Sequence, residues 1–184
     1  LMSLIDNHRR GKDFFNKIEK MIVYFKDDVK QIFTNTDLSD FFSKSKLSLF
    51  ILIKNQMLEI NESNINYFNN ISFIKYFYPE VLSIDSDYQL QFDDIELFNE
   101  NRMIGENHSY IAKLIRNDSI EEFITFVNEN SISLNSKINE SCFETNPLLI
   151  DRKLELIEYA AFFGSIQIFQ YLQNNNVKLT ESLW

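Results

Sequence analysis

The side chains that most often carry catalysis are scarce in this 184-residue chain, which has two histidines, His8 and His108, and one cysteine, Cys142. A catalytic thiol needs a base beside it, and a zinc site needs several Cys or His ligands at short spacing. Neither pattern surrounds these residues. We therefore expect solvated histidines and a loop or buried thiol, although Cys142 with His108 as its base is the pairing that an unfamiliar enzyme would need.

Neighbouring acidic residues are the other candidates for chemistry. Catalytic carboxylates must converge on one substrate, whereas neighbours on a helix point about 100° apart and more often form a solvated face. The three glycines provide no phosphate-binding loop and no nucleophile elbow. We predict that the chain is not an enzyme and that it has no catalytic, cofactor-binding or metal-binding residue. The acidic pairs are Asp27 with Asp28, Asp93 with Asp94, and Glu121 with Glu122.

The composition indicates a helical protein that does not bind nucleic acid and has no membrane span. Hydrophobic residues make up 45% of the chain, while the turn-forming residues glycine (3) and proline (2) are rare. A net charge of −9 opposes phosphate binding. No apolar run approaches the roughly 18 residues of a membrane span, and the first residues do not resemble a secretory signal. The expected location is the cytoplasm.

Apolar spacing predicts helices through the first hundred residues. Residues 14–33 show one amphipathic face, and residues 34–37 form a polar break, after which Asp37 or Ser39 can cap the next helix. Residues 47–53 are apolar almost all round, which favours a central helix over the competing β-strand. Further short helices should follow, the last one ending at Gly105. The apolar positions of the first face are Phe14, Ile18, Met21, Ile22, Phe25, Val29, Ile32 and Phe33.

The last third of the chain repeats itself. Residues 110–130 and 156–176 each hold an apolar helix, a short turn and a second helix, and the turns at Asp118 and Gly164 lie 46 residues apart. Such a pair needs a stacked neighbour to bury its apolar face. This alignment pairs Ile120, Phe123, Ile124 and Val127 with Ile166, Phe169, Gln170 and Gln173. Because apolar positions shift between the copies, we expect Ile168, Phe169, Tyr171 and Leu172 to carry the second core.

Residues 160–166, Ala-Ala-Phe-Phe-Gly-Ser-Ile, resemble the ankyrin repeat at the end of its first helix, and Asn176 stands where that family has a helix-ending glycine. The wider sequence is similar to Asn-, Phe- and Ile-rich ankyrin-repeat proteins of unicellular eukaryotes, which carry a helical N-terminal region of unknown function. The departures are the missing Thr-Pro-Leu-His start, Leu114-Ile115 in place of Ala-Ala, and the 46-residue spacing, which implies an insertion at 137–151.

The resemblance implies an all-α fold of stacked helical hairpins, an α-solenoid. It implies a helical region at 1–105 and repeats at 106–184, with the second complete pair at 154–179 and a third truncated at 180–184. The expected function is a non-catalytic scaffold that binds another protein and needs no cofactor. Alternatively, 1–105 is the structural cap of a longer repeat protein whose binding repeats lie beyond residue 184. By position in the ankyrin family's pattern, the resemblance implies two groups of protein-binding residues. They are Ser131, Ser133, Asn135, Lys178, Thr180 and Glu181 on the loops, and Glu155 and Glu158 on the inner face of the first helix.

Overall fold

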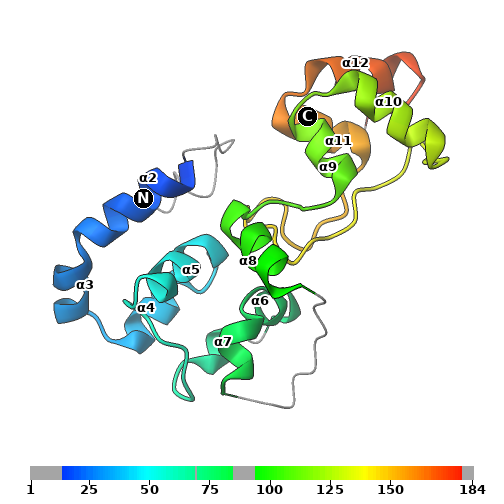
Figure 1. Ribbon diagram of the computed structural model, residues 1–184. Helices are drawn as coiled ribbons and strands as arrows, with labels where there is room; N and C mark the ends of the chain where they lie inside the picture. Colours follow the sequence, from blue (N-terminus) through cyan, green and yellow to red (C-terminus); the bar gives the residue numbers. More distant parts are fainter. Residues whose placement is uncertain (1–13, 69, 85–93, 180–184) are drawn as a thin grey trace. The chain divides into compact units, whose positions relative to one another are not determined.

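The computed structural model describes residues 14–68, 70–84 and 94–179. Every regular element within these ranges is helical, which confirms the all-α prediction. In the same ranges, an isolated β-bridge pairs Lys137 with Glu155. The chain divides into two compact units, whose helices are labelled in Figure 1. Unit 1 comprises Leu1–Glu106 and Cys142–Ile150, and unit 2 comprises Asn107–Ser141 and Asp151–Trp184.

The first predicted helix is present in unit 1 as two helices, α2 (Phe14–Tyr24) and α3 (Lys26–Ile32). The break falls at Phe25, whose backbone leaves the helical region (φ −98°, ψ 16°). The Phe25 amide donates to the carbonyl of Ile22 at 3.2 Å, which tightens this turn. The apolar spacing therefore predicted the helical conformation correctly but missed the change of axis.

The polar break does start a new helix, α4 (Asn35–Phe42), but its N-cap is Thr34. The Asp37 amide donates to Thr34 Oγ1, and Asp37 Oδ2 accepts from the Thr34 amide, so the two residues form a capping box. The next helix, α5 (Lys46–Lys54), begins after Ser45. Leu47, Leu49 and Ile51 are fully buried in it, so the predicted central helix is confirmed and the strand alternative is wrong.

Four short elements complete the helical part of unit 1: η1 (Ile65–Phe68), α6 (Ile71–Tyr76), α7 (Tyr78–Leu82) and α8 (Ile95–Ile104). Pro79 occupies the first turn of α7, where its missing N–H costs no hydrogen bond. Gly105 ends α8 in the left-handed conformation (φ 67°) as predicted. Between these elements the core is aromatic, with the Phe77 ring 5.1 Å from Phe68 and 4.9 Å from Tyr76.

The segment Cys142–Ile150 belongs to unit 1, although it lies between the two repeat-like stretches in the sequence. Its Phe143 ring packs edge-on against Phe98 of α8, with 5.2 Å between the centroids. Thr145 Oγ1 donates to the Gly105 carbonyl at 2.7 Å. The sequence predicted an insertion here within the region 106–184, and the insertion supplies part of the core of unit 1.

Unit 2 consists of two helix pairs, α9 (Tyr110–Arg116) with α10 (Ile120–Glu129), and α11 (Leu156–Phe163) with α12 (Ile166–Asn174). The helices pack within each pair, and α9 also packs on α11 and α10 on α12. The buried side chains facing this core include Leu114, Ile115, Ile157 and Ala160.

The turns of the two pairs share one hydrogen-bonding pattern. Asp118 (φ 53°) and Gly164 (φ 67°) are both left-handed. The amide that follows each residue donates five positions back, from Ser119 to Leu114 and from Ser165 to Ala160. At the far ends, Ser131 (φ 51°) and Asn176 (φ 63°) are left-handed as well, which confirms the conformation expected of Asn176.

The second helices are offset by one residue from the alignment of the turns. Phe123 and Val127 are buried in α10, and their counterparts in α12 are Ile168 and Leu172, 45 positions later. The pairing of Phe123 with Phe169 and of Val127 with Gln173 is therefore wrong by one residue, because the first buried position is the fourth residue of α10 but the third residue of α12. Of the four residues expected in the second core, Ile168 and Leu172 are fully buried, whereas Phe169 and Tyr171 are half-buried.

Candidate functional site

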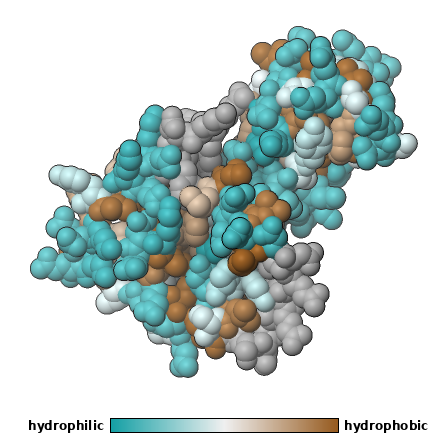
Figure 2. Space-filling view, viewed as in Figure 1, coloured by the Kyte–Doolittle hydropathy of each residue, from teal (hydrophilic) through white to brown (hydrophobic). Residues whose placement is uncertain are grey.

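An apolar groove of about 390 Å³ lies among α2, α3, α4 and α5 of unit 1. In the space-filling view, hydrophobic patches interrupt the otherwise hydrophilic surface over unit 1 (Figure 2). One wall of the groove is formed by Met21, Ile22, Phe25, Val29 and Phe33. The other wall is formed by Leu38, Phe41 and Phe42 of α4, and Leu52 and Met57 also line the groove.

The first wall follows from the spacing of the sequence. Phe25, Val29 and Phe33 recur every four residues, so they lie one above another on the face of α3. Val29 is half-buried, but Phe25 and Phe33 remain 49% and 37% exposed, and no described residue of α3 is fully buried. The sequence predicted this stripe as a core face, and the structure leaves it partly uncovered.

The second wall begins at the capping box of α4, which fixes the turn between the two walls. The hydrogen bonds that Asp37 accepts from the Thr34 hydroxyl and amide hold the pKa of this carboxyl below its usual range. From this start, Leu38 and Phe42 lie one turn apart on α4, while Phe41 is 63% exposed and its ring lies 5.9 Å from the ring of Phe33 in the first wall. An exposed phenylalanine beside an apolar hollow is typical of a contact surface.

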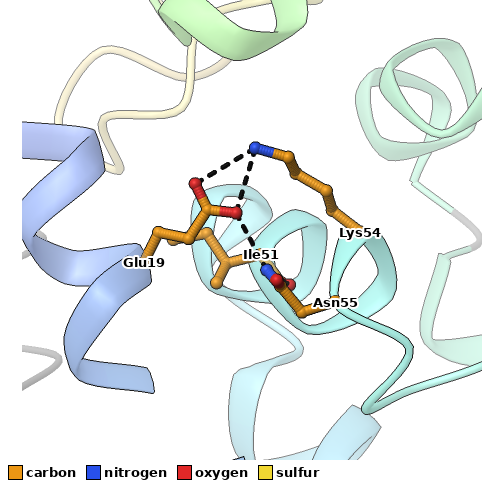
Figure 3. Close-up of polar contacts among 4 residues, drawn as sticks. All are labelled: Glu19, Ile51, Lys54 and Asn55. Atoms are coloured by element: carbon orange, nitrogen blue, oxygen red, sulfur yellow. Dashed lines mark hydrogen bonds and ion pairs between the residues drawn. The ribbon is translucent and has the colours of Figure 1, made fainter. Parts of the chain in front are cut away.

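A polar clamp fixes α2 to α5 and thereby sets the width of the groove (Figure 3). The Glu19 carboxylate accepts from Lys54 Nζ at 2.9 Å and from Asn55 Nδ2 at 2.9 Å, and Asn55 also donates to the Ile51 carbonyl. Burial alone would raise the pKa of Glu19, but the hydrogen bonds from Asn55 and Lys54 outweigh it and lower that pKa.

Unit 1 also buries the ammonium of Lys46. This Nζ donates to Ser72 Oγ at 2.5 Å and to the carbonyls of Cys142 and Glu144 at 3.0 and 3.2 Å. It lies 5.5 Å from the centre of the Phe73 ring, within cation–π range. Lys46 therefore holds the insertion onto α5 and α6, a structural role that the local sequence does not indicate.

Arg102 is the second buried cation. Its guanidinium lies 4.4 Å from the centre of the Phe50 ring, with Tyr76 and Phe98 also within 6 Å, and Arg102 Nη2 pairs with Glu80 Oε1 at 2.7 Å. Arg102 Nε and Glu80 Oε2 are buried without hydrogen-bond partners. With Phe77 at 5.8 Å, five aromatic or acidic partners surround one guanidinium, which indicates a structural centre of the core.

His108 and Cys142, the residues considered for catalysis, belong to different units. His108 is exposed, as expected, and its Nδ1 lies 2.9 Å from Ser141 Oγ, while partial desolvation lowers the pKa of the ring. Cys142 belongs to unit 1, and burial raises the pKa of its thiol despite the nearby ammonium groups of Lys46 and Lys75. A thiol with a raised pKa is largely protonated and weakly nucleophilic at neutral pH. His8 lies outside the described residues.

The predicted protein-binding residues of unit 2 fall into two groups. Ser131, Ser133 and Asn135 are exposed on the loop after α10, and Lys178 is exposed after α12. Thr180 and Glu181 lie outside the described residues.

Glu155 and Glu158 are half-buried at the start of α11. The Glu155 amide donates to Glu158 Oε2 at 2.7 Å, so this carboxylate caps its own helix. The bridge between Lys137 and Glu155 brings the loop after α10 and the start of α11 together. The structure therefore gathers the first loop and both glutamates on one part of unit 2.

No cluster of three or more His, Cys, Asp or Glu side chains in the described residues could hold a metal ion. The helices in those same ranges are all too short or too polar to cross a membrane.

The sequence indicated the loops of unit 2 but missed the groove of unit 1. The available signal was the pair Phe41 and Phe42 following closely on the stripe of Phe25, Val29 and Phe33, which supplies more aromatic side chains than three short helices can cover. Comparisons with protein-family models, curated proteins and solved structures find no match to this chain.

Proposed function

We propose that this chain is a non-catalytic protein-binding module whose C-terminal helix pairs are ankyrin-type repeats. The observation that carries the proposal is the agreement between the two pairs of unit 2. Along α10 and α12 the order of exposed, half-buried and buried positions is the same over nine residues, 121–129 and 166–174. Repetition of one packing pattern is the hallmark of repeat proteins, in which each unit contacts its neighbours.

Hydrogen bonds between the pairs support the same proposal. Asp118, in the turn of the first pair, accepts from the amides of Gln167 and Ile168 at 3.1 and 3.0 Å, and so caps a helix of the second pair. In return, Ser165 of the second turn donates its hydroxyl to the Ile115 carbonyl of α9. Each turn thus stabilises the neighbouring pair, as expected for units that stack in series.

Stacked helix pairs leave their loops free to bind, and the loop residues here suit a protein partner. Ser131, Ser133, Asn135 and Lys178 are exposed and follow the second helix of a pair. Hydroxyl and amide side chains of this kind form adaptable hydrogen bonds. With a net charge of −9, the chain favours a partner with a basic surface over a nucleic acid.

The test is affinity capture from a cell lysate with two matched variants. The loop variant combines Ser131→Arg, Asn135→Arg and Lys178→Glu, all at exposed positions. Glu158 is left unchanged because its carboxylate caps α11. The control variant combines Asn128→Arg and Gln173→Glu, which are exposed positions on the second helices, so that both variants keep the net charge of the natural chain.

We expect a protein that is enriched by the natural chain and by the control variant and is lost with the loop variant. Capture that is equal in all three would contradict binding through these loops. Turnover of a small molecule by the purified chain would contradict the non-catalytic assignment. Circular dichroism of each variant should match the natural chain, which separates lost binding from lost folding.

A further inference from the structure

We infer that the apolar groove of unit 1 is the contact surface for a second copy of this chain, with Phe41 of each copy inserted into the groove of the other. This inference concerns unit 1 and does not depend on the proposed function of unit 2. A symmetric contact of this kind is self-complementary, because the same patch provides both the protruding side chain and the hollow that receives it.

The first argument is the concentration of exposed apolar side chains. Among the described residues, 21–41 contain seven large hydrophobic side chains that are exposed to solvent. Phe41 and Ile32 are 63% and 69% exposed. Monomeric proteins seldom leave such a patch open to water, and a patch of this kind usually marks an interaction site.

The second argument is the area available for burial. Phe25, Phe33 and Phe41 are 49%, 37% and 63% exposed. Taking about 200 Å² for a whole aromatic side chain, these three offer about 300 Å². Met21, which also lines the groove and is 42% exposed, brings the patch to about 400 Å², so two copies would bury about 800 Å² through these side chains. An area of this size is typical of a weak, transient contact and corresponds to a weak dimer.

The third argument is the size of the hollow. At about 390 Å³ the groove falls in the range of cavities that enclose small molecules, about 300–1,000 Å³, and therefore accepts an aromatic ring. Phe41 belongs to one of its walls and is exposed. Each copy thus provides one exposed ring beside one apolar hollow, the arrangement that a two-fold contact requires.

The fourth argument is charge, which selects this surface over others for self-contact. Residues 14–57 contain seven lysines and five acids, a net charge of +2, while the whole chain carries −9. Residues 58–106 contain ten acids and two basic residues, a net charge of −8, so contact between two copies through that part of the chain would bring strongly acidic surfaces together. Contact through the groove avoids that acidic part.

The experiment is sedimentation equilibrium of the full chain from about 5 to 500 µM, a range that spans weak self-association. The test variant is Phe41→Glu and the matched control is Ile166→Glu, because both side chains are 63% exposed and neither supports a core. We expect the natural chain and Ile166→Glu to approach twice the 21.9 kDa chain mass as concentration rises. Phe41→Glu should remain at the mass of one chain, with self-association weakened at least tenfold.

Two results would overturn the inference. A natural chain that stays monomeric at 500 µM would leave the groove to a helix of a different protein. A Phe41→Glu variant that dimerises like the natural chain would place the self-contact on another surface.

Discussion

The two units stabilise their cores by different means. Unit 1 buries Lys46, Arg102 and Glu144 among aromatic rings and backbone carbonyls. In the described part of unit 2 no charged side chain is buried, and the turns of its two helix pairs use matching backbone hydrogen bonds. A repeated unit can reuse one solution, whereas an irregular unit must satisfy each buried group individually. Unit 1 should therefore be the more sensitive to loss of a single polar group.

The largest effect should follow Arg102→Met. The substitution leaves the partly buried Glu80 carboxylate without its counter-charge, which should lower the free energy of unfolding by about 3 kcal/mol. Urea denaturation followed by circular dichroism measures this loss. The double variant Glu80→Gln with Arg102→Met should recover at least half of it, because no buried charge is then left unpaired. If Arg102→Met alone were as stable as the natural chain, the buried Arg102 would not stabilise unit 1.

Lys46→Met comes next. It keeps the apolar stem but leaves Ser72 Oγ and the carbonyls of Cys142 and Glu144 without the ammonium donor, at a cost of about 2–3 kcal/mol. Hydrogen exchange with mass spectrometry should show faster exchange in 142–150. The control Lys30→Met, which removes a bond to the Gln56 carbonyl at an exposed position, should cost under about 0.5 kcal/mol. Unchanged protection of 142–150 would show that Lys46 does not hold this segment.

In unit 2 the corresponding test compares two single variants, Asp118→Ala and Gly164→Ala. Both positions are left-handed, so alanine costs about 1 kcal/mol in place of Gly164 and about 0.5 kcal/mol in place of Asp118, which already carries a Cβ. Asp118→Ala also removes the cap on α12, which adds about 1 kcal/mol. Urea denaturation should therefore rank Asp118→Ala as the more damaging change. Equal losses would mean that the bonds from Asp118 to the second pair contribute nothing.

The smallest effect should come from acid. The pKa of Glu19 is below its ordinary value in the folded chain, so its clamp contributes stability above that ordinary value and loses it as pH falls through the folded pKa. Hydrogen exchange of α2, corrected for the intrinsic rate, should rise between pH 5 and pH 3. Glu19→Gln should show a smaller rise than the natural chain, and an equal rise in both would exclude the clamp as its cause.

The sequence predicted most of the helices because their signals are local. Apolar residues spaced three or four apart, the capping residues near Thr34 and the glycines at 105 and 164 each affect the backbone only within a few residues. The register of unit 2 was missed by one residue, since the alignment relied on the turns, whereas the buried face starts one residue earlier in α12 than in α10.

The groove and the buried cations could not be predicted in the same way. Whether Phe25 and Phe33 are covered depends on elements that pack from elsewhere in the chain. Lys46 resembles an ordinary boundary charge until residues nearly a hundred positions later supply its carbonyl acceptors. The loop residues of unit 2 could be placed from the resemblance alone, and their binding role remains a prediction.

The placement of Cys142–Ile150 in unit 1 has a consequence for biosynthesis. Unit 1 is not complete when residue 106 leaves the ribosome, because the carbonyls that accept from Lys46 belong to residues 142 and 144. At about 5–20 residues per second, the ribosome needs about 2–9 s more to add the chain up to residue 150. During that interval the nascent chain has an uncovered aromatic core, and this is the period in which a chaperone would have most to protect.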